Sequence, residues 1–146
     1  MGWTHDLIEA LAADMAARGI GTYNPAGYTG TESKPIYLGP IPPEVDEAIG
    51  LTPYSGVDDP VIADVIQPIQ MWLRGPRDAG RGSVNATADA IFDAYHGASR
   101  LTFGAVQAAL VTRQSAVPMG TDEQDRAERS DNYYFTAMRP TASRPD

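Results

Sequence analysis

The chain contains no cysteine and only two histidines among its 146 residues. The lack of cysteine excludes disulfide bonds, thiolate nucleophiles and zinc sites that use thiolates. His5 and His96 lie too far apart in the sequence for the short ligand spacing of a metal motif. Neither Ser115 nor Ser130 lies in a Gly-x-Ser-x-Gly elbow. The sequence therefore favours a protein that is not an enzyme.

Basic residues are also scarce. The chain has 11 lysines and arginines against 19 acidic residues, which gives a net charge of −8. This balance argues against tight sequence-independent binding to nucleic acid, which needs a basic surface. The acidic pairs at 58–59 and 122–123 lie in turn or loop segments without the order of a calcium loop, so we expect no metal there.

Long apolar runs are missing as well. No run approaches the about 20 residues that cross a bilayer. The first six residues lack the basic region and apolar core of a signal peptide. Together with a hydrophobic content of 42%, this predicts a soluble protein without a membrane partner.

Helical periodicity is clearest near the N-terminus. Thr4 is a suitable N-cap, and the apolar residues that follow at helical spacing predict a helix over 4–18, ended by Gly19 or Gly21. A second helix is predicted from the N-cap Ser83 to Gly97. The residues expected on its buried face are Val84, Ala88, Ile91, Phe92 and Tyr95.

Short alternating segments predict strands at 35–39, 48–55, 64–74, 101–103, 106–114 and 132–139. Pro68 demands a bulge or an unpaired edge in the third of these. Most connectors are too short for helical crossovers, so we expect an α+β fold with a mostly antiparallel sheet of four to six strands and two helices on one face. We expect one domain over 1–139 and a flexible tail over 140–146.

Two polar segments are predicted as loops. Residues 115–130 form a loop that is long for a compact domain, which usually indicates function or disorder. The segment 74–82 contains Arg74, Arg77 and Arg81, the only local basic cluster. We favour a solvated loop for it; the alternative is a contact with an acidic neighbouring subunit or a DNA phosphate.

Aromatic residues fall on both faces of the last strand. Of Tyr133, Tyr134 and Phe135, only one side can face the helices, so Tyr134 is expected on the opposite side. Trp72 takes a similar position on the third strand. Helices on one side leave the other side of the sheet half-exposed, and apolar residues there predict a protein partner.

The order of several motifs resembles the tail terminator (minor capsid) proteins of long-tailed phages of actinobacteria. The motifs cover most of the chain and end with the block at 113–120 and 128–134. They are WTHDLIEALA at 3–12, GIGTY at 19–23, IYLGPIPP at 36–43, DDP at 58–60, Q-x-x-x-R-G at 70–75, DAYHG at 93–97, RQSAVPMG at 113–120 and ERSDNYY at 128–134.

The resemblance implies a structural protein of the virion neck, made in the host cytoplasm, with no catalysis and no cofactor. It implies a homo-oligomeric ring, usually a hexamer, that stops polymerisation of the major tail tube protein and docks onto the head connector. DNA would pass through the lumen without specific binding. The residues expected at the subunit or tube interface are Trp72, Arg74, Arg77, Arg81, Arg113, Arg129, Asp131 and Tyr134.

Two other readings remain open at this point. One is another neck component, such as a head-closure protein. The other is a small-molecule-binding or hydrolytic α+β domain, which would need a pocket with convergent polar groups.

Overall fold

The computed structural model describes residues 2–56 and 58–144. Val57 of the expected turn at 57–60 and the last two residues of the expected tail lie outside these described residues. The elements, in chain order, are α1 (Trp3–Ala17), β1 (Ile36–Tyr37), β2 (Ala48–Pro53), β3 (Asp64–Arg77), α2 (Gly82–Tyr95), β4 (Ser99–Phe103), β5 (Val106–Thr121) and β6 (Arg126–Met138).

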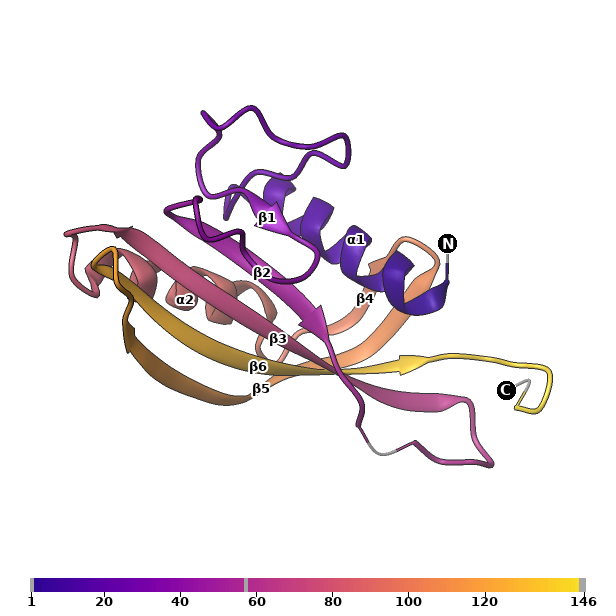
Figure 1. Ribbon diagram of the computed structural model, residues 1–146. Coiled ribbons are helices and arrows are strands. Elements are labelled where there is room, and N and C mark those ends of the chain that lie inside the picture. The colour runs from indigo at the N-terminus through magenta and orange to yellow at the C-terminus, as the bar shows by residue number, and fades with distance from the viewer. Residues whose placement is uncertain (1, 57, 145–146) are drawn as a thin grey trace.

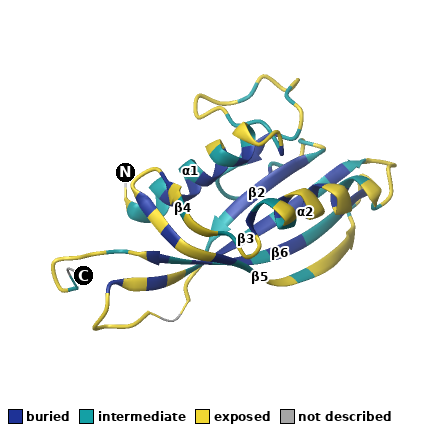
Figure 2. Cartoon of the chain, turned by 180° about the vertical axis from the view of Figure 1, so that it is seen from behind, coloured by how far each residue is buried: buried dark blue, intermediate teal, exposed yellow. Residues whose placement is uncertain are grey.

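Six strands form one sheet in the order β1-β2-β3-β6-β5-β4, and both helices lie on one side of it (Figure 1). Figure 2 views the molecule from the side of the helices and shows buried strand residues beneath them. The predicted α+β class with two helices on one face is confirmed. The sheet is mixed, because β1 runs parallel to β2 while the other neighbours are antiparallel.

The first helix forms where the apolar spacing predicts it. Leu7, Leu11 and Met15 recur at helical spacing and are buried in the core. The N-cap position is Gly2, not the predicted Thr4, so α1 begins slightly earlier. After the helix the chain turns at Gly19, whose φ of +77° is one that a side chain would oppose.

The second helix begins after Arg81, and no side chain caps it. The predicted N-cap Ser83 lies inside the helix, and its hydroxyl donates to Glu47 instead. Gly97, with a φ of +80°, follows the helix as predicted and lets the chain enter β4. The buried faces of α1 and α2, together with Phe103 and Phe135, whose ring centroids lie 5.6 Å apart, form one continuous core.

Pro68 lies one residue beyond the last β2–β3 pair, Pro53 with Ile69. The position of its missing N–H therefore lies on an unpaired edge of β3, which is one of the two predicted arrangements, and no bulge forms. The register of β3 with β6 is unbroken from Asp64 to Arg74. On the other side, the Tyr54 N–H donates to the Pro68 carbonyl at 3.1 Å. Proline has no N–H to donate to the Tyr54 carbonyl in return. The Gln67 side-chain amide replaces it by donating to the Tyr54 carbonyl at 2.9 Å.

The predicted loop at 115–130 is also wrong. β5 continues to Thr121 and β6 starts at Arg126, so only residues 122–125 form a turn. The Asp122 carboxylate organises this turn by accepting the backbone N–H groups of Gln124 and Arg126 at 3.0 and 2.9 Å. Pro118 and Gly120 made this segment look like a loop in the sequence, because proline and glycine are uncommon inside strands. The segment can extend because β6 pairs there with β3 as well as with β5.

Candidate assembly surface

The two histidines have separate structural roles. His96 stacks on Phe92 and accepts the Arg113 backbone N–H at 2.9 Å. His5 lies on α1 beside Glu9 at 3.5 Å. Within residues 2–56 and 58–144, no three His, Asp or Glu side chains come together as they would around a metal ion.

The side of the sheet opposite the helices differs from the rest of the surface in the lack of charge across its central part. Because side chains alternate along a strand and cross-strand partners share a face, the pairings define its members. Trp72 lies between Gly50 and Ser130, and Tyr134 lies beside Pro68. We call the central part of this surface, between the Arg74–Glu128 pair and Asp64, the outer face. It comprises Thr52, Tyr54, Ile66, Pro68, Gln70, Trp72, Leu110, Thr112, Ser115, Val117, Ser130, Asn132, Tyr134 and Thr136.

Every residue of the outer face is uncharged, although charged residues make up 21% of the chain. The neighbouring charges are the Arg74–Glu128 pair at one end and Asp64 at the other. Depletion of charge and enrichment of tyrosine and tryptophan distinguish the centres of protein interfaces from ordinary surface. The outer face therefore has the composition of a surface that another protein covers.

Hydrogen bonds link several polar side chains of this face. Gln70 donates to Ser130 at 3.1 Å, and Asn132 donates to Ser115 at 3.1 Å. The Tyr54 hydroxyl donates to the Asn132 side-chain oxygen at 3.2 Å. A shallow hollow lies at the centre of this network, lined by Thr52, Tyr54, Gln70, Gln114, Ser115, Asn132 and Tyr134. A partner would thus meet a rigid, neutral surface.

Two of the predicted interface residues, Trp72 and Tyr134, lie on the outer face and are half-buried. The Trp72 indole N–H donates to the Glu128 carboxylate at 2.8 Å. This bond holds the ring against the sheet and leaves its plane as contact area. Their role at an interface stays a prediction.

The arginines of the segment 74–82 form hydrogen bonds and ion pairs within the chain. Arg74, whose side chain is 10% exposed, pairs with Glu128 at 3.0 Å. It also donates to the Val45 carbonyl at 2.8 Å. Arg77 pairs with Asp46 at 2.9 Å, and Arg81 donates to the Glu128 carbonyl at 2.8 Å. These guanidinium groups join the connector before β2 to the β5–β6 hairpin, so they do not form a free basic patch. A contact with a neighbour stays a prediction for them.

Arg113, Arg129 and Asp131 lie on the helix side of the sheet. The Arg129 guanidinium binds the buried Asp131 carboxylate at 2.8 Å and donates to Asn85 of α2 at 3.0 Å. Arg113 lies 3.7 Å from Asp131, and its guanidinium covers the Phe92 ring at 4.3 Å. The three residues thus attach α2 to the sheet. Their place at a subunit interface stays a prediction.

The structure contains a projecting segment where the sequence predicts only a turn. Residues 58–65 extend past the body of the sheet beside the C-terminal part of β6 (Figure 1). Val61 and Ile62 at its tip are 77% and 49% exposed. The only sequence signal was an apolar pair directly after Pro60 in a segment that otherwise predicts a turn.

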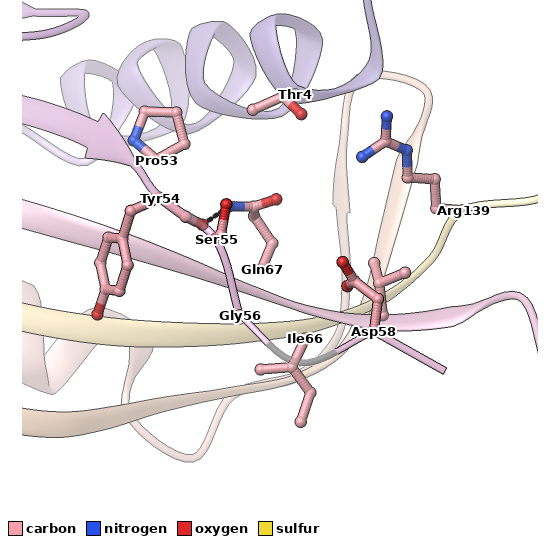
Figure 3. Close-up of a pocket in the computed structure, with 10 residues that line it drawn as sticks. Thr4, Pro53, Tyr54, Ser55, Gly56, Asp58, Ile66, Gln67 and Arg139 are labelled. Atoms are coloured by element: carbon pink, nitrogen blue, oxygen red, sulfur yellow. Dashed lines mark hydrogen bonds between the residues drawn. The ribbon is translucent and has the colours of Figure 1, made fainter. Parts of the chain in front are cut away.

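A second hollow lies at the base of this segment, between the start of α1 and the first residues of β3 (Figure 3). Asp58, Gln67 and Arg139 line it, and Gln67 is already bonded to Tyr54. The Arg139 guanidinium lies over the Trp3 ring at 5.0 Å. The Gln67 and Arg139 side chains are therefore already engaged within the chain.

Residues 15–139 match the family model described as bacteriophage tail terminator protein. The chain belongs to this family. The tail terminator fold also resembles a chain of a solved structure described as the virion of a native gene transfer agent particle, with a TM-score of 0.62 at 18% sequence identity. The likeness covers 90% of this chain and 91% of that chain and shows a shared fold. No curated protein gives a significant match.

Membership of the tail terminator family makes the chain a structural component of a phage-type virion, which functions by assembling with other particle proteins. Neither helix within the described residues is long and apolar enough to cross a bilayer.

Proposed function

We propose that the chain forms a ring, hexameric as the family resemblance implies, on the last ring of the major tail tube protein. The ring stops growth of the tube and presents the surface that joins the tail to the head connector in the virion neck. The observation that carries this proposal is the uncharged outer face of a family member whose net charge is −8. A protein of that charge can pack against further copies most easily through a neutral surface.

The charge distribution also suits the passage of DNA. Phosphate binding needs free guanidinium or ammonium groups. Arg74, Arg77 and Arg81 are engaged in bonds with carboxylates or carbonyls of the same chain. A net acidic ring would let the genome pass without retaining it.

Tail length in particles assembled without this protein tests the proposal. We expect electron micrographs of tails from a deletion mutant to show tubes that exceed the normal length, and wild-type protein supplied in trans to restore that length. Tails of normal length that fail to join heads would instead indicate a head-closure protein and would reject tube termination.

A further inference from the structure

Among residues 2–56 and 58–144, the large apolar side chains with the highest exposed fractions, Val61 and Ile62, lie in the projecting segment, which is part of what we call the arm. It comprises residues 58–65 together with 138–144 and lies beyond the outer face. On the basis of the proposed ring, we infer that the ring is built head to tail: the Val61–Ile62 tip of one copy lies on the outer face of the next copy.

The arm is held in shape by its own hydrogen bonds. The Asp59 carboxylate accepts the backbone N–H groups of Val61 and Ile62 at 2.7 and 3.2 Å. The Arg139 N–H donates to the Ala63 carbonyl at 2.9 Å. The Arg144 guanidinium donates to the carbonyls of Asp59 and Ile62. A segment fixed in this way loses little conformational freedom when it binds.

Within residues 2–56 and 58–144, nothing covers the Val61 side chain, which is 77% exposed. The arm continues β3 and β6 beyond the body of the sheet, and its tip lies past their ends (Figure 1). The hollow of the outer face lies back along the same strands, around Gln70 and Asn132. The tip therefore cannot reach the hollow of its own copy. A contact between the two requires a second copy.

The outer face matches the tip in charge. The tip residues 60–63 are uncharged, as is the whole outer face. Two other surfaces are less suitable because they are acidic. The hollow beside β1 is lined by Glu32, Glu44, Asp46 and Glu47, and α2 exposes Asp89 and Asp93. Two copies that each carry a charge of −8 repel each other least when neutral surface meets neutral surface.

Arm and outer face are different patches of one chain, so their contact is heterologous. Repetition of such a contact gives a ring when the rotation closes and a filament when it does not. Each copy then offers one tip and one face, and every tip in a closed ring is buried. This arrangement supplies a contact that the proposed ring requires.

The absence of native cysteine allows a direct test by site-specific cross-linking. Val61→Cys and Ser115→Cys would be purified separately, mixed on tail tubes and treated with a short bis-maleimide. We expect dimers in the mixture and none with either variant alone. The double variant should form a ladder of cross-linked species that ends at the ring. Asp89→Cys on α2, in place of Ser115→Cys, is the matched control and should give no cross-link with Val61→Cys.

A dimer formed by Val61→Cys alone would indicate that arm meets arm and would overturn the inference. Cross-linking to Asp89→Cys instead of Ser115→Cys would overturn it as well.

Charge variants separate this inference from the proposed function. Val61→Asp, which damages only the tip, and Val117→Asp, which damages only the outer face, should each fail to form rings. Mixed with each other, they should form a dimer through the one intact tip and the one intact face, as measured by native mass spectrometry. Normal rings from Val61→Asp would overturn the inference and leave the function standing. A wild-type chain that forms no ring even on tail tubes would overturn both.

Discussion

Single buried side chains connect parts of the chain that are distant in sequence. The Arg126 side chain is 2% exposed and binds Asp122 at 2.8 Å and Asp46 at 3.1 Å. It also donates to the Val45 carbonyl at 2.7 Å. These bonds fasten the β5–β6 turn to the connector before β2. Burial tends to raise the pKa of Asp122, but the backbone N–H groups of Arg126 and Gln124 and the Arg126 guanidinium outweigh it and lower that pKa.

We expect Arg126→Met to lower the free energy of unfolding by about 2 to 3 kcal/mol, because it removes the charged hydrogen bonds that the buried guanidinium makes to Asp122, Asp46 and the Val45 carbonyl. Urea denaturation measures this change. Arg77→Met is the matched control: it removes a second partner of Asp46, but the Arg77 side chain is 52% exposed. The control should cost less than about 1 kcal/mol. Equal losses in the two variants would contradict the assigned role of Arg126.

The Tyr133 hydroxyl is buried without a hydrogen-bond partner in the described part of the chain. Burial raises the pKa of this tyrosine, against the opposing charge of Arg113. We expect Tyr133→Phe to leave stability unchanged or to raise it by about 1 kcal/mol, since it removes an unsatisfied polar atom.

Tyr95→Phe provides the opposite case, because the Tyr95 hydroxyl donates to the Asp14 carboxylate at 2.5 Å. We expect this variant to lose about 1.5 to 3 kcal/mol, as for other hydrogen bonds to charged groups. Thermal unfolding of both variants measures the contrast. A larger loss for Tyr133→Phe than for Tyr95→Phe would show that the Tyr133 hydroxyl has a partner.

Among the elements, the helices followed the sequence more closely than the strands did. The spacing of Leu7, Leu11 and Met15 determines α1 locally, because residues three and four apart share one helix face. The second half of β5 has no such local signal. Its cross-strand partners in β6 include Arg129 and Asp131, which are charged although they face the helices. Arg129 binds both Asp131 and Asn85 of α2. No apolar alternation marks a strand of this kind.

The Glu32 carboxylate organises one turn of the connection between α1 and β1. Glu32 accepts the backbone N–H and the hydroxyl of Thr29 as well as the Gly30 N–H. These bonds, first of all the Thr29 N–H, lower the pKa of Glu32 to about 2.

Because the pKa is lowered in the folded state, this stabilisation is complete above the unfolded value of about 4.5 and is lost as the pH falls toward about 2. We expect nuclear magnetic resonance titration to give Glu32 a midpoint near 2, and the Thr29 and Gly30 amide signals to move with it. Glu32→Gln should give these amides their acid-form positions already at neutral pH. A midpoint near the ordinary glutamate value would show that the carboxylate does not order this loop.

The whole molecule combines a net charge of −8 with an uncharged outer face. The charge opposes close approach of copies at long range, whereas the face offers contact at short range. The two effects differ in their response to salt, because salt screens repulsion between exposed charges but leaves apolar contact in place.

We expect ring formation to become stronger between about 0.1 M and about 1 M sodium chloride, over which the Debye length falls from about 10 Å to about 3 Å. Sedimentation velocity measures the fraction of assembled protein. Val61→Asp serves as the control and should stay unassembled at every salt concentration. Dissociation of the wild-type ring at high salt would show that ion pairs, not neutral surfaces, hold the copies together.

The sequence by itself determined the two helices, the position of most strand cores, the acidic charge and the family resemblance, which the family match confirmed. These properties depend on composition and on neighbours a few residues apart. The tertiary structure decided which residues are free for partners. It placed Arg126 beside Asp46, 80 positions away, and used the arginines expected at an interface for internal bonds. It also left the outer face and the arm tip uncovered, because only the pairing of distant strands decides which side chains share a surface.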